Sequence, residues 1–384
     1  MEYGSREDIG GIQEGAGMKK ILVTFGTRPE AIKLASLIMR LKKEKSVKLS
    51  VCATGQHRHM LDQVLSAFKI TPDFDMDVMT KDQAVEGVIT KVLFKMGKVL
   101  DTIKPDIVVV QGDTTTAFAI SLAAFLRKIK IAHIEAGLRS HDKHRPFPEE
   151  ANRRLISHIA DLHFAPTAGA ARNLVKENID KKTIFVTGNT GIDALLMIAR
   201  KKEAVLPRSL RFLDRKKRLI LVTAHRRESF GKPLREICTA LKNIADVRKD
   251  VEIVYPVHLN PSVRKTVYKM IKGKKRIQLI APLSYEEFVY AMKLSYLILT
   301  DSGGIQEEAP SLKKPVLVMR EVTERQEGIK AGCARLVGLR QALITKNVIA
   351  LLENKKLYNK MSSIKNPYGD GNAAGRIADI LKKA

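Results

Sequence analysis

Tryptophan is absent from this 384-residue chain, and aromatic residues make up only 5% of it. Proteins that bind single-stranded nucleic acids stack the bases on aromatic side chains, and few such platforms can form here. The net charge of +27, from 68 basic and 41 acidic residues, would otherwise favour a nucleic-acid partner. The basic residues lie in short scattered runs, so we expect no nucleic-acid partner. A basic cleft for a small polyanionic substrate would account for part of the excess charge, and a solvated lysine-rich surface for the rest.

Cysteine is scarce, and long apolar runs are missing. Cys52, Cys238 and Cys333 form no CxxC pair, which favours reduced thiols in the cytoplasm over disulfides or zinc. His57 and His59 have no acidic or cysteine partner nearby, so we expect no metal. No apolar run approaches ~20 residues, which excludes a membrane-spanning helix. The N-terminus lacks the pattern of a signal peptide, and we expect a cytoplasmic protein.

What the chain does contain is a repeated alternation of apolar strands and helices. We expect residues 1–17, which are polar and glycine-rich, to be a disordered extension. The continuous apolar run at 106–110 is typical of a central parallel strand. The scheme begins again after a charged stretch at 201–218, so the domain boundary falls within 188–218. The sequence therefore predicts an α/β protein with two doubly wound Rossmann-like domains facing a central cleft.

The stretch from Thr300 to Ala309 has the strongest functional signal. An apolar strand ends there, Ser302, Gly303 and Gly304 follow, and a helix begins. Free backbone N–H groups at a helix start can bind phosphate, and glycine allows a phosphate to approach the backbone closely. Glu308, about one turn into the helix, could accept hydrogen bonds from sugar hydroxyls. Together these features indicate a nucleotide, although a glycine-bearing helix start without a ligand would have the same sequence.

Polar residues also follow the predicted strands of the first half. Arg28 begins a helix after the strand at 20–25 and could bind a phosphate or stack on a base. Asp113 and Glu135 follow two further strands, and Glu149 opens a helix. Carboxylates are poor phosphate ligands but good acids and bases. Each also has a structural explanation, because Asp113 could cap a helix and Glu149 suits a helix N-terminus. The chain has neither GxGxxG nor GxxxxGK[ST], so dinucleotide and ATP sites have no support.

Motifs spread over residues 18–384 resemble those of the non-hydrolysing UDP-N-acetylglucosamine 2-epimerases, in the same order as in that family. They are FGTRPEAIK, TGQHR, QGDTTT, IEAGLRS, PFPEEANRR, TGNTGIDAL, VTAHRRESFG, YPVHLNP, LTDSGGIQEEAPSL, the pair Glu324 and Arg325, and NPYGDG.

The resemblance implies a glycosyltransferase B-type fold, a homodimer, and interconversion of UDP-GlcNAc and UDP-ManNAc without a cofactor. It implies an N-terminal domain at 18–190 and a UDP-binding C-terminal domain at 191–365. A terminal helix within 366–384 would cross back to the first domain.

The resemblance also implies roles for individual residues. The acid/base carboxylates would be Asp113, Glu135 and Glu149, and His225 would act beside the diphosphate. The substrate-binding residues would be Arg28, Lys43, Ser302, Gly303, Gly304, Glu308 and Arg325. A second, activating UDP-GlcNAc is bound in some relatives at positions that match Gln56, Glu150, Arg226 and His258 here. His59 stands near them in place of a usual glutamine and is included with this group.

The chemistry can be argued independently of the resemblance. A sugar C2–H has no neighbouring carbonyl, so its direct removal would be prohibitively slow, and no nicotinamide motif exists to oxidise C3 or C4. Expulsion of UDP from C1 while a base removes the C2 proton gives a 2-acetamidoglucal, to which UDP adds again after protonation on the other face. The helix start, Arg28 and His225 would stabilise the departing diphosphate. The residues leave open which carboxylate is the base.

Four alternatives remain at this point. A hydrolysing 2-epimerase would release ManNAc and UDP. A related epimerase would act on another sugar nucleotide, such as one bearing a 3-acetamido uronic acid. A glycosyltransferase would use the same fold and the same UDP contacts but needs an acceptor. A non-catalytic sensor would bind the sugar nucleotide without turnover.

Overall fold

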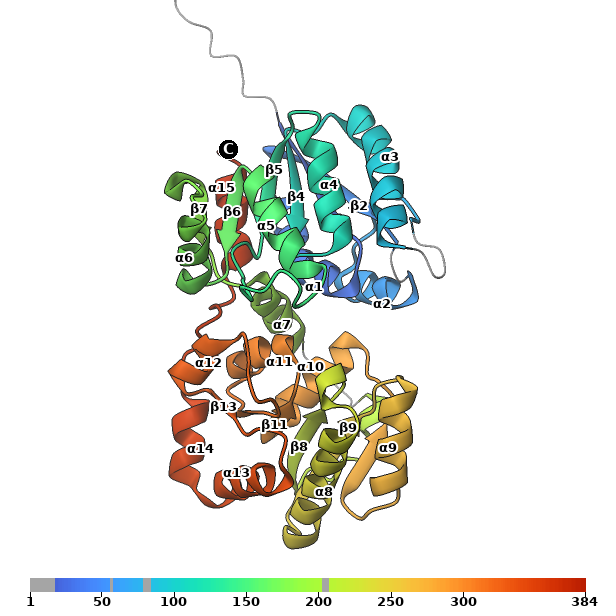
Figure 1. Cartoon of the computed structure of the whole chain (residues 1–384), viewed down its shortest axis with the longest axis vertical. Coiled ribbons are helices and arrows are strands. Elements are labelled where there is room, and N and C mark those ends of the chain that lie inside the picture. Colours follow the sequence, from blue (N-terminus) through green and yellow to red (C-terminus); the bar gives the residue numbers. More distant parts are fainter. Residues whose placement is uncertain (1–17, 56–57, 79–83, 202–206) are drawn as a thin grey trace, which may run out of the picture.

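The computed structural model describes residues 18–55, 58–78, 84–201 and 207–384. The predicted extension at 1–17 lies outside the described residues. The chain folds into two lobes, one above the other, with the helix α7 (Thr190–Ala199) between them (Figure 1). Each lobe contains one fully parallel β-sheet with helices on both faces. The predicted α/β class with two doubly wound domains is therefore confirmed.

The first lobe is built on a seven-stranded sheet in the order β3-β2-β1-β4-β5-β6-β7. Its strands are β1 (Lys19–Phe25), β2 (Val47–Ala53), β3 (Phe74–Asp75), β4 (Ile107–Gln111), β5 (Lys130–Ile134), β6 (Leu162–Ala165) and β7 (Ile184–Val186). Its helices are α1 (Arg28–Leu41), α2 (Arg58–Phe68), α3 (Val85–Ile103), α4 (Thr115–Phe125), α5 (Glu149–Ile159) and α6 (Ala168–Lys176).

The second lobe is built on a six-stranded sheet in the order β10-β9-β8-β11-β12-β13. Its strands are β8 (Arg218–Thr223), β9 (Val251–Pro256), β10 (Ile277–Ile280), β11 (Leu297–Thr300), β12 (Val316–Val318) and β13 (Ala334–Leu336). Its helices are α8 (Lys232–Val247), α9 (Pro261–Ile271), α10 (Tyr285–Leu294), α11 (Gly303–Glu308), α12 (Gln326–Ala331), α13 (Gln341–Glu353) and α14 (Lys355–Ser362). The last helix of the chain is α15 (Ala373–Leu381).

Both sheets reverse their strand order at one place, between β1 and β4 in the first and between β8 and β11 in the second. The loops after two such strands diverge to opposite faces and leave a crevice at the carboxyl edge of the sheet. Arg28 and Asp113 follow β1 and β4, and His225 and Ser302 follow β8 and β11. The topology thus places most of the predicted site residues at the two crevices.

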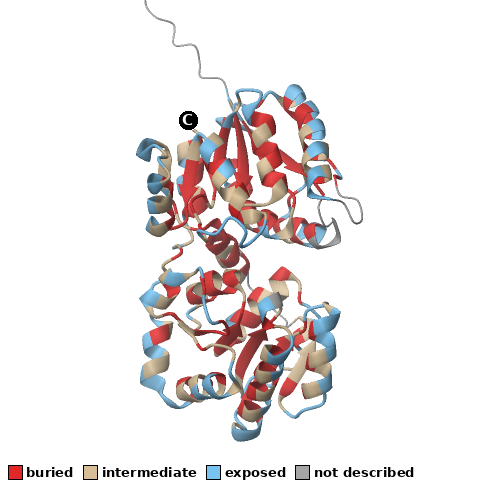
Figure 2. Ribbon diagram, in the orientation of Figure 1, coloured by how far each residue is buried: buried red, intermediate tan, exposed pale blue. Residues whose placement is uncertain are grey.

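The central strands are buried because helices cover both of their faces. All five residues of β4 are buried, as are all four of β11 (Figure 2). A capping box fixes the start of the helix α1. In it, the side chains of Thr27 and Glu30 each accept a hydrogen bond from the other's backbone N–H group. Glu30 also accepts a hydrogen bond from Thr114 Oγ1 at 2.7 Å, which ties the loop after β1 to the loop after β4.

The chain returns to the first lobe at its end. The helix α15 packs against α1 and α7 and lies beside β6 in the upper lobe (Figure 1). Asp193 of α7 accepts hydrogen bonds from the backbone N–H groups of Ala373 and Ala374, and so caps the start of α15. We propose domain boundaries near residues 190 and 365, with α15 belonging to the first domain.

Two local features lie near the end of the second lobe. The helices α13 and α14 are separate because Asn354 stands between them and caps Leu357 with its side chain. The segment after β12 ends in the short helix α12, which begins at Gln326. None of the described helices is both long and apolar enough to cross a bilayer.

Candidate functional site

A cavity of about 450 Å³ opens at the crevice of the first sheet, and it is lined by residues of both lobes. It is lined by Thr27, Pro29, Glu30, Lys33, Gln111, Gly112, Asp113, Thr114, Glu135, Leu138, Arg153 and Arg325. The first eleven come from the first lobe, and Arg325 comes from the second. Two of the three predicted acid/base carboxylates, Asp113 and Glu135, therefore share one cavity with Arg325, which is predicted to bind the substrate.

Glu135 is the most enclosed of these carboxylates. Lys33 Nζ donates to both of its carboxylate oxygens at 2.6 Å, and Gln111 Nε2 donates to one of them. Burial raises the pKa of Glu135, but the adjacent Lys33 outweighs burial and holds the pKa below its usual value. The backbone of Glu135 has φ of +66°, a left-handed conformation that costs roughly 1–2 kcal/mol in a residue with a side chain. This strained turn directly follows β5 and brings the carboxylate to the cavity.

Asp113 enters the same cavity from the loop after β4. Arg153 of α5 donates to its carboxylate, with an N···O distance of 2.7 Å. Asn152 of the same helix donates to its backbone carbonyl at 2.9 Å. Arg153 also bonds to Glu150 at 3.0 Å, so two acids share one guanidinium. One carboxylate oxygen of Asp113 thus lies against Arg153, at the wall of a cavity where a ligand could reach the carboxylate.

Glu149, the third predicted carboxylate, opens α5 and does not line the cavity itself. Its Oε2 is buried and has no hydrogen-bond partner among the described residues. A buried acceptor without a partner is costly, and in a native protein it calls for a proton, a water or a ligand group. Glu149 thus opens the helix that carries Arg153, with one carboxylate oxygen buried and unpartnered among the described residues.

The turn formed by Ser302, Gly303 and Gly304 after β11, here called the glycine turn, contacts Arg325, which lines the cavity. A Cβ added at Gly303 would lie 3.0 Å from the guanidinium carbon of Arg325, so this side chain packs closely on the turn and would have to shift for a larger residue. The Arg325 Nε bonds to Glu307 at 2.8 Å. Beside Gly304 a Cβ would meet no atom within 4 Å, so the turn faces open space there. A phosphate could approach the backbone at Gly304 while its charge is met by Arg325.

His225 lies at the end of β8, held by Asp301 from the neighbouring strand. Asp301 is fully buried and accepts from the backbone N–H groups of His225 and Arg226 at 2.8 and 2.9 Å. Its other oxygen is 3.3 Å from His225 Nδ1. Burial lowers the pKa of His225, while Asp301 opposes this effect. Asp301 thus holds the backbone at the end of β8 and lies beside the imidazole of His225.

Arg28 and Glu308 interact electrostatically across the space between the lobes. Burial lowers the pKa of Arg28, and the charge of Glu308 raises it. Burial and then repulsion from Glu307 raise the pKa of Glu308 to about 8, while Lys33 and Arg28 act in the opposite direction. A carboxyl group with this pKa changes its ionisation near neutral pH, where enzymes work.

The comparison with known proteins agrees with this geometry. The sequence model of a family described as UDP-N-acetylglucosamine 2-epimerase matches residues 39–382. A UDP-N-acetylglucosamine 2-epimerase of Campylobacter jejuni is 50% identical over 375 residues, which cover 95% of this chain and 98% of that protein. This chain belongs to the UDP-N-acetylglucosamine 2-epimerase family. The resemblance drawn from the sequence motifs is thereby confirmed.

Solved structures show the same fold in this family. The UDP-GlcNAc 2-epimerase of Neisseria meningitidis bound to UDP-GlcNAc superposes with a TM-score of 0.89 at 45% identity, covering 95% of this chain and 100% of that chain. MurG of Acinetobacter baumannii superposes with a TM-score of 0.59 at 16% identity, covering 95% and 100%, and shares the fold alone. The two-lobed glycosyltransferase B-type architecture predicted for this epimerase is confirmed.

The structure separates one predicted ligand of the epimerase from the rest. Lys43 lies beyond the end of α1, exposed to solvent, at the opposite end of that helix from the cavity. The lysine of α1 that lines the cavity is Lys33. The role of Lys43 stays a prediction, and Lys33 is the lysine of this helix that lines the cavity. Lys33 is the last residue of the motif FGTRPEAIK, which was the available signal.

The predicted activator residues lie in several environments. Gln56 and the side chain of His59 lie outside the described part of the chain. Glu150 is fully buried and accepts from two backbone N–H groups and from Arg153. Arg226 pairs with Glu324 at 3.3 Å. The exposed ring of His258 stacks on His225 with centroids 5.5 Å apart, so it lies beside the loop that follows β8.

Sequence reasoning missed the residues that fix Arg325 in place. Tyr368 Oη donates to the carbonyl of Arg325 and accepts from Gly328 N–H, both at 2.9 Å. Asn189, from the start of α7, donates to Glu307 at 2.6 Å. Tyr368 belongs to the motif NPYGDG, so the segment that crosses back also supports the site.

Among the described residues no group of three or more His, Cys, Asp or Glu side chains could hold a metal ion.

Proposed function

We propose that this epimerase interconverts UDP-GlcNAc and UDP-ManNAc by eliminating UDP and adding it back. A base takes the C2 proton, the C1–O bond breaks with its electron pair passing to UDP, and a C1=C2 double bond forms. Protonation of C2 on the opposite face and return of the UDP oxygen to C1 complete the reaction. The observation that carries this proposal is the cavity at the first sheet, where carboxylates meet Arg325 next to the glycine turn.

Residues of both lobes would hold the nucleotide. Ser302, Gly303 and Gly304 would bind the diphosphate through backbone N–H groups. Arg28, Arg325 and His225 would supply positive charge or hydrogen bonds to the departing phosphate, which lowers the barrier to breaking the C1–O bond. Glu308 would accept hydrogen bonds from the ribose hydroxyls. Lys33 is added to this group because it lines the cavity beside Glu135.

Asp113, Glu135 and Glu149 would exchange the C2 proton. Glu135 is paired with Lys33, which lowers its pKa and favours the ionised form, and Asp113 is paired with Arg153. Glu149 Oε2 is buried without a partner among the described residues, and a proton on this carboxyl group would relieve the cost of that burial. Inversion at C2 requires proton transfer on two faces of the ring, which several carboxylates around one cavity can provide.

Turnover of UDP-GlcNAc in heavy water tests the proposal against its rivals. Deuterium should appear at C2 of both UDP-sugars, and UDP should remain attached at equilibrium. Accumulation of free ManNAc would indicate a hydrolysing enzyme, and binding without exchange would indicate a sensor. Turnover that requires an added acceptor would indicate a glycosyltransferase. Exchange confined to a different UDP-amino-sugar would move the substrate and leave the mechanism in place.

Glu308 should make UDP binding dependent on pH. Its pKa is raised to about 8, and a carboxylate accepts hydrogen bonds from ribose hydroxyls better when ionised. The ionised fraction then rises about tenfold between pH 7 and pH 9, and the Kd for UDP should fall by a similar factor. Isothermal titration calorimetry measures this trend. Glu308→Gln should bind UDP with a flat profile over this range, and a flat wild-type profile would refute the role of Glu308.

A second molecule of UDP-GlcNAc would bind beside the loop that follows β8 and activate the enzyme. Arg226 and His258 face this region, and Glu150 would act through the loop that it holds. The same proposal includes Gln56 and His59.

The three cysteines Cys52, Cys238 and Cys333 are free and buried, which agrees with a reducing compartment such as the cytoplasm.

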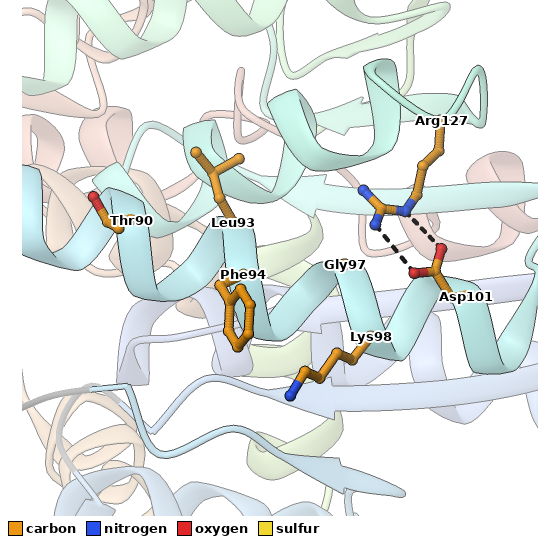
Figure 3. A pocket seen from close by; sticks show the side chains of 7 residues that line it. All are labelled: Thr90, Leu93, Phe94, Gly97, Lys98, Asp101 and Arg127. Atoms are coloured by element: carbon orange, nitrogen blue, oxygen red, sulfur yellow. Dashed lines mark hydrogen bonds and ion pairs between the residues drawn. The ribbon is translucent and has the colours of Figure 1, made fainter.

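The enzyme would act as a homodimer, joined through the outer face of α3 and the end of α4. A surface cavity of about 500 Å³ lies there, lined by residues that include Phe94, Gly97, Asp101 and Arg127 (Figure 3). Phe94 is 67% exposed and projects from α3 (Figure 3), and Leu126, next to Arg127, is 67% exposed. Apolar side chains exposed this far on one face are typical of a protein interface. The charged pair of Arg127 and Asp101 beside them gives this face both signs of charge, which would allow like residues of two copies to meet without repulsion.

Replacing both apolar side chains should separate the dimer. We expect Phe94→Ser with Leu126→Ser to elute as a monomer when size-exclusion chromatography is combined with light scattering. The matched control is Val247→Ser with Leu259→Ser, which removes two residues of similar exposure from the second lobe and should leave a dimer. A monomeric wild type, or a dimeric Phe94 and Leu126 variant, would refute this interface.

A further inference from the structure

The strand β5 carries a histidine inside the first sheet, one residue before the strand ends. His133 is 1% exposed and pairs in register with Val110 on β4 and with His163 on β6. A polar ring buried at the centre of a sheet is costly unless it forms hydrogen bonds. Its bonding therefore indicates what the ring is for.

The contacts of His133 determine which ring nitrogen carries its proton. Nε2 lies 2.8 Å from the carbonyl oxygen of Gly112. A carbonyl only accepts, so Nε2 carries the hydrogen. Nδ1 is buried with no partner among the described residues, and is the bare nitrogen. Burial lowers the pKa of His133 to about 3, so the ring is neutral throughout the pH range in which the enzyme works.

The carbonyl that His133 holds belongs to the peptide group preceding Asp113. That peptide group is planar, so the direction of the Gly112 carbonyl also sets the direction in which the Asp113 backbone leaves it. Gly112 has φ of +74°, and its N–H donates to the carbonyl of Ile134 at 3.0 Å. Two neighbouring residues of β5 therefore bond to Gly112: Ile134 accepts from its N–H, and His133 donates to its carbonyl. A glycine has broad freedom of rotation, and this pair of bonds removes it.

We propose that His133 is a positioning residue for the epimerisation, because its bond to the Gly112 carbonyl fixes the direction in which Asp113 enters the cavity. The inference rests on the proposed role of Asp113 in proton transfer. Among the described residues the ring of His133 bonds only to Gly112, and it does not exchange protons with the substrate. Arg153 then holds the carboxylate of Asp113 from the side of α5. The backbone bond and the side-chain bond together leave one orientation.

Three substitutions of His133 separate positioning from packing. His133→Leu removes the donor at similar volume and should lower kcat by about 10- to 100-fold, the loss expected when a reacting group moves by about 1 Å. KM and the Kd for UDP should change by less than about threefold, since the nucleotide ligands lie elsewhere. His133→Gln places an amide N–H near the position of Nε2 and should recover most of kcat. His133→Asn carries the same amide on a shorter side chain and should not.

His163 provides the matched control. It is also 1% exposed, lies on the adjacent strand, and has its Nε2 2.8 Å from a backbone carbonyl, that of Ser157. His163→Leu should lower the melting temperature about as much as His133→Leu does, and should leave kcat within about twofold of wild type. Equal losses of kcat in the two leucine variants would overturn the proposal, as would equal kcat in His133→Gln and His133→Asn.

Crystal structures provide a readout that does not depend on turnover. The Gly112 carbonyl should turn away from its wild-type direction in His133→Asn, and keep that direction in His133→Gln and His163→Leu. A wild-type enzyme without epimerase activity would refute the proposed function, and the carbonyl would still report on His133. An unchanged Gly112 and Asp113 in His133→Asn would refute the positioning role even in an active epimerase.

Discussion

Asp113→Asn is expected to lower kcat by about 10²- to 10⁴-fold, which is the range for loss of a general acid or base. The substitution preserves shape and can keep a hydrogen bond from Arg153, so the loop after β4 should stay in place. Asp113 lies in the first lobe, whereas the glycine turn and Glu308 lie in the second. The Kd for UDP should therefore change by less than about threefold. Steady-state kinetics with UDP-GlcNAc and calorimetry with UDP measure the two effects separately.

A second acid in the following loop serves as the control for this prediction. Asp142 is exposed, and its carboxylate accepts from the backbone N–H of His144 at 3.0 Å. Asp142→Asn removes one negative charge without touching the cavity, and should keep kcat within about twofold. Near-normal turnover in Asp113→Asn would exclude this carboxylate from proton transfer. Proton exchange would then have to be assigned to Glu135 and Glu149.

The general position of the site was predictable because parallel sheets follow simple rules. Apolar runs without alternation, such as that at 106–110, predict strands covered on both faces, and β4 is buried along its whole length. The carboxyl ends of such strands lie at one edge, and strand order reverses at one point. These rules bring Arg28 close to Asp113 and His225 close to Ser302 before any side-chain contact is known.

The contacts within the site were harder to predict, because they depend on the register between distant strands. In the sequence, His133 appears only as a polar residue within an apolar strand. Its bond to Gly112 exists because β5 pairs with β4 so that His133 lies opposite Val110. The left-handed backbone of Glu135 is likewise invisible in a sequence, where only glycine and asparagine would suggest it.

Helix geometry could have separated Lys33 from Lys43. The helix α1 begins at the carboxyl edge of the first sheet, so its first turns lie near a ligand and its last turns lie far away. Ten residues of helix span about 15 Å, which removes Lys43 from the site. The sequence contains both lysines, and only their distance from the capping box at Thr27 and Glu30 distinguishes them.

Lys33→Met should damage both the folding and the turnover of the enzyme. It leaves Glu135 enclosed without its main cation, and an uncompensated buried charge costs about 3 kcal/mol or more of folding free energy. It also removes positive charge from the wall of the cavity, so kcat/KM should fall by about 10²- to 10³-fold. Lys43→Met makes the same chemical change at the exposed end of the same helix, and should match wild type in both stability and kcat/KM. Denaturant unfolding and steady-state kinetics of the two variants measure both effects.

The pH dependence of stability identifies the cause of the damage. In the wild type the pKa of Glu135 is lowered, so this group adds stability above its unfolded pKa of about 4.3, and the contribution is lost as pH falls through the lower folded value. Without Lys33, burial dominates and the folded pKa rises. The sign then reverses, because protonation removes the unpaired charge and the variant gains stability as pH falls from 8 towards 5.5. Melting temperatures of Lys33→Met should therefore rise on acidification relative to those of Lys43→Met. Parallel curves for the two variants would show that Lys33 does not hold the charge of Glu135.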